Sequence, residues 1–74
     1  MSDLAPGNTF VAPQDDTAVR LSAPSLSTSY QRRDDGVSGW GNSTAVTTGH
    51  PITLMLHRND EIRNSGNSTL RVEQ

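Results

Sequence analysis

Apolar and polar residues alternate along three stretches of the chain, at 17–23, 52–57 and 68–73. In the second stretch, every other residue is isoleucine or leucine, and threonine, methionine and histidine fill the positions between them. A period of two residues is typical of a β-strand that buries one face. We therefore expect three half-buried strands at these positions.

The rest of the chain adds strand signals and no helix signal. Residues 25–30 alternate as well, and Pro24 in front of them marks an edge or a bulge because proline cannot donate to a ladder. No ten-residue stretch has the i, i+3, i+4, i+7 apolar spacing of a helix. The pattern predicts an all-β chain with a small antiparallel sheet.

Turn residues divide these segments. Asp35-Gly36 supplies the positive φ of a tight hairpin turn. Residues 59–67 are polar apart from Ile62, and we expect them to form a loop that joins the strands at 52–57 and 68–73 as a hairpin.

The N-terminal segment differs from the rest. Residues 1–16 contain Pro6 and Pro13 and little alternation, which is typical of an extended arm. Phe10 and Val11 are its apolar anchor, suited to a neighbouring surface. The organisation we expect is an N-terminal arm over 1–16 and a small antiparallel β domain over 17–74.

The apolar content is small for a domain that folds alone. The 74 residues include six leucines, five valines, two isoleucines and one phenylalanine. Burial of so few side chains offsets little of the conformational entropy that folding costs. We therefore expect partner subunits to complete the sheet. The chain has no cysteine, which excludes disulfides and thiolate zinc sites, and its net charge of −2 argues against diffuse nucleic-acid binding.

Catalytic and metal-binding patterns are missing from the sequence. His50, His57, Asp60 and Glu61 form the one candidate cluster, and their spacing matches no known ligand set. There is no nucleophile elbow and no phosphate-binding glycine loop with its lysine. We expect no enzyme, no metal, no cofactor and no small-molecule substrate. The absence of a long apolar run or a signal peptide predicts no membrane association.

Two local features stand out. Gly-Asn-Ser-Thr occurs at 41–44 and again at 66–69, each time before a short apolar segment, and we interpret the two copies as similar turn-to-strand entries. Trp40 lies between two glycines, which favours a packing anchor.

The order of the segments resembles the N-terminal half of levivirus-type coat proteins, from single-stranded RNA bacteriophages. The stretches that carry this resemblance are 17–21, 28–32, 50–57 and 68–74. The resemblance implies one sheet, with a face toward the genome that presents Arg20, Thr53, Met55, His57 and Arg71. Coat proteins of that family continue into two helices, whereas this sequence ends at Gln74. It is therefore either a fragment or a different small virion protein.

We hypothesise a virion structural protein: a coat, cement or minor capsid subunit that is assembled in the host cytoplasm. Its partners are then copies of itself or other virion proteins, and viral nucleic acid is a further hypothesis. The alternative is a small β-barrel that serves as a protein-binding adaptor or regulatory module. The residues expected at a partner interface are Phe10, Val11, Tyr30 and Trp40.

Overall fold

The computed structural model describes residues 2–74, which form eight strands and no helix. The strands are β1 (Ser2–Leu4), β2 (Thr9–Val11), β3 (Thr17–Ser22), β4 (Thr28–Arg33), β5 (Thr44–Val46), β6 (Ile52–Leu56), β7 (Glu61–Asn64) and β8 (Leu70–Glu73). The prediction of an all-β chain is confirmed.

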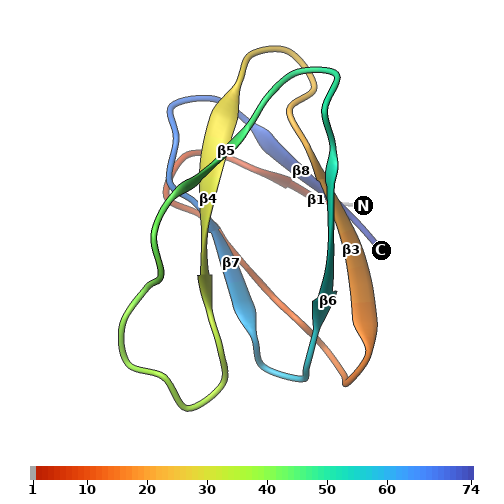
Figure 1. Cartoon of the computed structure of the whole chain (residues 1–74), viewed down its shortest axis with the longest axis vertical. Helices are drawn as coiled ribbons and strands as arrows, with labels where there is room; N and C mark the ends of the chain where they lie inside the picture. The colour runs from red at the N-terminus through yellow and green to blue at the C-terminus, as the bar shows by residue number, and fades with distance from the viewer. Residues whose placement is uncertain (1) are drawn as a thin grey trace.

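The strand pairing is that of one long hairpin rolled into two layers. β1 pairs with β8, β2 with β7, β3 with β6 and β4 with β5, all antiparallel. Pairing of β3 with β8 and of β4 with β7 then builds two four-stranded sheets (Figure 1). Sheet 1 has the order β1-β8-β3-β6 and sheet 2 the order β2-β7-β4-β5. This is the strand order of a jelly roll.

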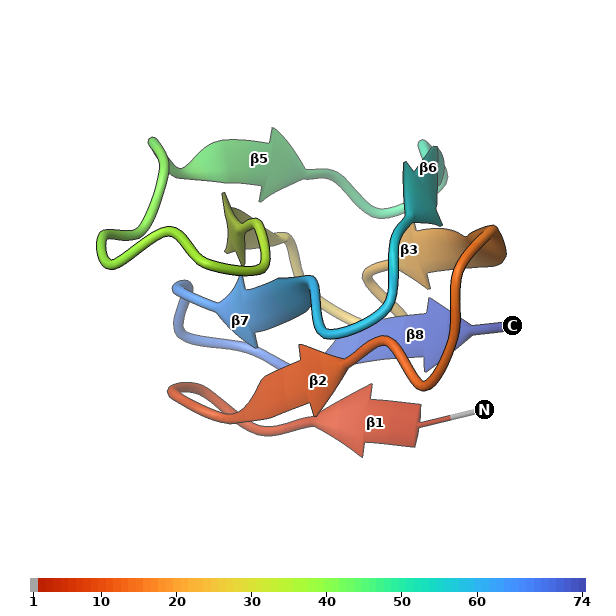
Figure 2. The ribbon, with the colours of Figure 1, turned by 90° about the horizontal axis from the view of Figure 1, so that it is seen from below.

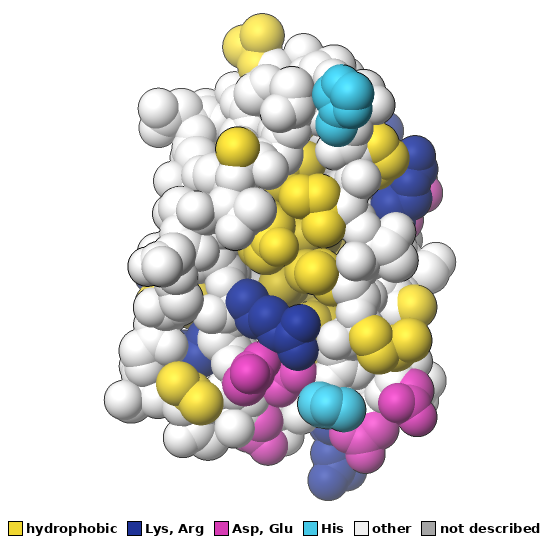
Figure 3. Space-filling model, in the orientation of Figure 1, with side chains coloured by type: hydrophobic (Ala, Val, Ile, Leu, Met, Phe, Trp, Pro, Cys, Tyr) yellow, Lys and Arg dark blue, Asp and Glu magenta, His cyan; other side chains and the backbone are white. Residues whose placement is uncertain are grey.

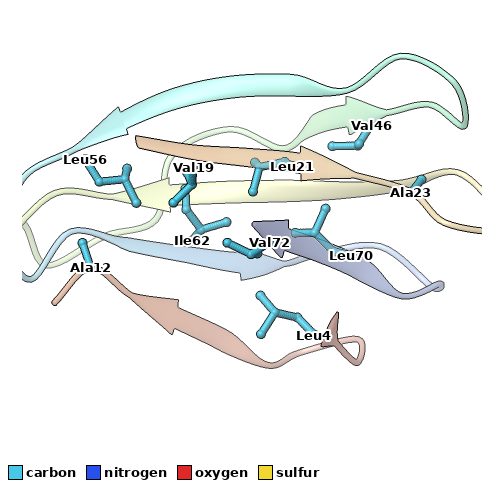
Figure 4. Packing of buried hydrophobic residues seen from close by; sticks show 10 residues of the cluster. All are labelled: Leu4, Ala12, Val19, Leu21, Ala23, Val46, Leu56, Ile62, Leu70 and Val72. Atoms are coloured by element: carbon cyan, nitrogen blue, oxygen red, sulfur yellow. The ribbon is translucent and has the colours of Figure 1, made fainter. Parts of the chain in front are cut away.

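The two sheets lie face to face, as Figure 2 shows, with β5, β4, β7 and β2 on one side and β6, β3, β8 and β1 on the other. The core fills the space between them (Figure 4). Its buried apolar residues are Leu4, Ala12, Val19, Leu21, Ala23, Val46, Leu56, Ile62, Leu70 and Val72. The alternation predicted for β3, β6 and β8 is therefore present, with every second side chain turned inward.

The N-terminal segment differs from the expected arm. Apart from Met1, which lies outside the described residues, it supplies β1 to sheet 1 and β2 to sheet 2. Leu4 and Ala12 are buried in the core. Each strand has three residues, too few for alternation to be visible in the sequence. Both prolines lie outside the strands, at the β1–β2 turn and after β2.

The expected polar loop at 59–67 is also different. It contains β7, which lies between β2 and β4 in sheet 2 and buries Ile62 and Asn64. Consequently β6 and β8 do not form a hairpin; both pair with β3, which lies between them.

The turn predicted at Asp35-Gly36 follows the end of β4. The Asp35-Gly36 turn is present: Gly36 has a φ of 84°, and the Val37 N–H donates to the Asp34 carbonyl at 3.0 Å. The chain then continues as a loop to residue 43 before β5 begins.

Of the stretches that carry the coat-protein resemblance, those in β3, β6 and β8 share sheet 1, whereas β4 belongs to sheet 2.

Candidate functional site

The outer face of sheet 1 carries four of the five residues predicted to contact nucleic acid. Arg20 lies opposite Thr53 in the β3–β6 register, and Met55 lies opposite Ala18. Arg71 lies on β8, opposite Ser22 of β3. Residues directly opposite each other point to the same face, and the residues between them are buried. These four side chains therefore share one solvent-facing surface.

Each arginine on this surface faces an acid. The Nε of Arg71 donates to the carboxylate of Asp3 at 2.9 Å, and Nη1 of Arg20 lies 3.8 Å from the carboxylate of Glu73. The hydrogen bond from Arg71 lowers the pKa of Asp3 and keeps it ionised. The four charges cancel, so the outer face of sheet 1 has no excess of positive charge.

The fifth predicted contact, His57, lies apart from the others. It follows the last residue of β6, and its side chain is exposed at the end of the sheet. Its backbone N–H donates to Oδ2 of Asp60 at 2.8 Å.

Among the described residues, Asp60 has a buried carboxylate that accepts hydrogen bonds from three residues. It is 1 % exposed and accepts hydrogen bonds from the backbone N–H groups of Asp35 and His57 and from Arg32. Burial raises its pKa, but the two N–H groups and the positive charge of Arg32 outweigh that effect and lower it. Glu61, the next acid, pairs with Arg33 at 2.8 Å. Both acids therefore serve structural contacts.

The residues predicted for a partner interface do not form one surface. Phe10 and Tyr30 face inward and pack against the core. Val11 points outward and is 50 % exposed. Trp40 lies in the loop between β4 and β5, on the outer side of sheet 2.

Trp40 contacts two arginines of sheet 2. The guanidinium carbons of Arg33 and Arg63 each lie 4.4 Å from the centre of its ring. Two hydrogen bonds hold the loop in place: Gly41 donates its N–H to the carbonyl of Arg32 at 2.9 Å, and Gln31 donates its side-chain amide to the carbonyl of Gly41 at 3.1 Å. Such a stack of guanidinium on indole is a cation–π contact.

An open cavity of about 420 Å³ lies beside this stack, and we call it the Arg63 cavity. Its lining residues are Gly7, Gln31, Ser43, Arg63, Asn64, Ser65 and Gly66. The hydroxyl of Ser65 lies 2.9 Å from that of Ser29 and 3.0 Å from that of Ser43, so three serines form a connected row. Apart from Gly7 and Gly66, the lining residues have polar side chains.

Arg63 is the charged group of this cavity. It donates to the side-chain oxygen of Gln31, at 3.2 Å from Nε. Among residues 2–74, no carboxylate lies within ion-pair distance of it, whereas Arg33 beside it is paired with Glu61. The positive charge in this cavity therefore has no counterion among residues 2–74.

Sequence reasoning missed this site because Arg63 lay in a predicted loop. One signal was present in the repeated Gly-Asn-Ser-Thr. Ser43 of the first copy and Gly66 of the second line the same cavity, and each copy leads into a strand.

A second surface lies between β5 and β6, the outermost strands of their sheets on one side of the sandwich. A turn with a bridge between Thr47 and His50 connects them at one end. Ile52 and Leu54 face the core from β6 and remain partly exposed. Figure 3 looks onto this side and shows a strip of apolar surface in a hollow between the strands.

The strands β5 and β6 themselves carry no formal charge, and the charged side chains that Figure 3 shows at the lower end of the hollow belong to other segments. Residues 36–56 contain no aspartate, glutamate, lysine or arginine. Apolar exposure without charge is the composition of an interface core. We call this surface the β5–β6 side.

Residues 2–74 contain no group of three or more histidine and acidic side chains arranged to hold a metal ion, and no helix long and apolar enough to cross a membrane. We take the Arg63 cavity and the β5–β6 side as the candidate sites. Comparison of the chain with known protein families, with curated proteins and with solved structures finds no match.

Proposed function

We propose that this chain is a virion structural protein, a coat, cement or minor capsid subunit that assembles with copies of itself or with other capsid proteins through its β5–β6 side. The observation that carries the proposal is the partial exposure of Ile52 and Leu54 between two uncharged edge strands. The resemblance to levivirus-type coat proteins implies a single sheet, whereas this chain forms two packed sheets, so the resemblance does not narrow the proposal further.

Edge strands explain why this side suits assembly. An edge presents unpaired backbone N–H and C=O groups, and monomeric proteins protect it with charges, prolines or bulges. The five residues of β6, from Ile52 to Leu56, include none of these protections. The jelly roll is also a common architecture of viral capsid domains, which supports the proposal by analogy of fold.

The sequence of β6 is compatible with pairing to itself. In an antiparallel pair, opposite side chains point to the same face, so inward residues must meet inward residues. A register centred on Leu54 meets this condition: Leu54 of one copy lies opposite Leu54 of the other, and Thr53 lies opposite Met55. No like charges meet across the two-fold axis, because β6 has no charge.

Analytical ultracentrifugation at micromolar concentration tests the proposal. We expect a dimer or larger species, and Thr53→Lys is expected to shift it to monomer because a charge then lies at the paired edge. Ala18→Lys is the matched control, since Ala18 is exposed on the same face one strand further in. A monodisperse wild-type monomer that unfolds cooperatively contradicts the proposal.

Disulfide trapping tests the register. The chain has no native cysteine. A mixture of Thr53→Cys and Met55→Cys is expected to cross-link under mild oxidation faster than either variant alone. Ala18→Cys, which lies away from the edge, should remain monomeric under denaturing conditions.

Genome contact is a subsidiary part of this proposal, located on the outer face of sheet 1. The measurement is the salt dependence of RNA affinity, because each phosphate contact adds to its slope. If the face binds RNA, Arg20→Ala with Arg71→Ala lowers both affinity and slope. An unchanged slope rejects genome contact and leaves the assembly proposal standing.

The alternative function is a protein-binding adaptor that uses Trp40. Its support is that this indole lies in a loop on the outer side of sheet 2, stacked on two arginines, and only partly buried. The required result is that Trp40→Ala keeps the fold and loses partner binding. Retained binding excludes this function.

A further inference from the structure

We propose that the Arg63 cavity binds a sugar acid, a monoanionic sugar whose carboxylate pairs with Arg63 and whose hydroxyl groups bond to Gln31, Ser43 and Ser65. The ligand is bound and not transformed. The inference rests on the outer face of sheet 2 and does not depend on assembly through the β5–β6 side.

The single uncompensated positive charge of the cavity favours a ligand with one negative charge. Arg63 has no acidic partner among the described residues, whereas Arg33 is compensated by Glu61 at 2.8 Å. The site therefore offers one uncompensated positive charge. A second negative charge on the ligand gains no partner, because the charge of Arg33, the neighbouring arginine, is already neutralised by Glu61. One carboxylate matches this arrangement better than a phosphate dianion.

The guanidinium of Arg63 is held in place before any ligand arrives. The ring of Trp40 lies 4.4 Å from its central carbon, and the side-chain oxygen of Gln31 accepts from its Nε at 3.2 Å. Nη1 has no hydrogen-bond partner among residues 2–74. A planar fork that is already oriented loses little conformational entropy when it binds a carboxylate.

The remaining lining matches a polyol. Hydroxyl groups donate and accept, and the row formed by Ser29, Ser65 and Ser43 presents two such groups to the cavity wall. The amide of Gln31 links Arg63 to the carbonyl of Gly41. The cavity of about 420 Å³ falls within the range of small-ligand sites.

Trp40 provides a direct readout, because it is the only tryptophan and it stacks on Arg63. Glucuronate is the probe, followed by intrinsic fluorescence and by amide chemical shifts. We expect a saturable change, with shifts at Gln31, Ser43 and Ser65. Glucose, acetate and inorganic phosphate, at the same concentration and ionic strength, are expected to bind about tenfold more weakly or worse, because each lacks the carboxylate or the hydroxyls.

Variants locate the binding. Arg63→Gln is expected to weaken glucuronate binding about tenfold or more, since it removes a charge-assisted hydrogen bond. Ser43→Ala, at an exposed position, should weaken it by a smaller factor. Arg20→Gln on sheet 1 is the matched control and should leave it unchanged.

Several outcomes overturn the proposal. Equal affinity for acetate shows that the hydroxyl groups contribute nothing, and tighter binding of phosphate shows a general anion site. Saturable binding of single-stranded RNA in this cavity without glucuronate binding assigns it to nucleic acid. No shift at Ser43 or Ser65 with glucuronate excludes the cavity as its site.

Discussion

Arg32 and Asp60 form an ion pair that connects β4 to the turn between β6 and β7. Nη2 of Arg32 lies 3.2 Å from Oδ2 of Asp60, and the same carboxylate accepts from the N–H groups of Asp35 and His57 at 2.8 Å. One buried carboxylate thus joins the β4–β5 loop, the end of β6 and the start of β7. Its loss is expected to loosen that end of the sandwich.

Asp60→Asn is therefore expected to lower the free energy of unfolding by about 2 kcal/mol or more, because hydrogen bonds to a charged acceptor are lost in a buried place. Urea denaturation at pH 7 measures the change. Asp34→Asn is the matched control: Asp34 also pairs with Arg32, but its side chain is 59 % exposed. Equal effects from the two variants contradict a special role for Asp60.

The same carboxylate predicts a pH dependence. The folded-state pKa of Asp60 is lowered, so its contribution to stability is fully present above the unfolded pKa of an aspartate, about 3.9, and is lost as the pH falls below that value through the folded pKa. We expect the wild-type unfolding free energy to decrease below about pH 4 more steeply than that of Asp60→Asn. Parallel curves for the two proteins contradict the assignment.

Gly66 is expected to tolerate no side chain. A Cβ at this position lies 2.6 Å from the backbone nitrogen of Ser29 and 2.9 Å from the Cα of Thr28, and backbone atoms cannot move aside cheaply. Gly66→Ala should cost about 1–3 kcal/mol in thermal or urea unfolding. Gly39→Ala is the control, since its Cβ meets nothing within 4 Å, and we expect a change within about 0.5 kcal/mol.

Substitution of Ile62 tests whether residues 61–64 form the buried strand β7. Its side chain is fully buried, so Ile62→Ala should destabilise the fold by about 2–5 kcal/mol. Leu26→Ala, at a 67 % exposed position, should change stability by no more than about 0.5 kcal/mol. If residues 59–67 form a polar loop, both substitutions are nearly neutral in urea denaturation.

The sequence predicted those strands whose buried faces are apolar at every second position. β3, β6 and β8 satisfy this condition, and the side on which Arg20, Thr53 and Met55 lie followed directly from it. β7 does not satisfy it, because one of its two inward residues is Asn64.

Asn64 is buried because distant groups satisfy its amide. It accepts a hydrogen bond from the hydroxyl of Thr28 at 2.7 Å and donates to the carbonyls of Leu4 at 2.8 Å and Ser68 at 2.6 Å. Thr28 and Leu4 lie 36 and 60 residues away from Asn64 in the sequence, so a local sequence pattern could not predict this strand. The Arg63 cavity was missed for the same reason: β4, β7 and three loops bring its residues together.

Leu4 decides whether the N-terminal segment is a part of the core or a peripheral arm. It lies opposite Leu70 in the β1–β8 register and is 7 % exposed, so Leu4→Ala removes packing between the two sheets. We expect a loss of about 2 kcal/mol or more in the unfolding free energy, measured by urea denaturation. Val11→Ala, in the other N-terminal strand but half exposed, should change it by no more than about 0.5 kcal/mol. An arm that merely follows the surface gives two small, similar effects, whereas a strand that closes the core gives a large effect at Leu4 alone.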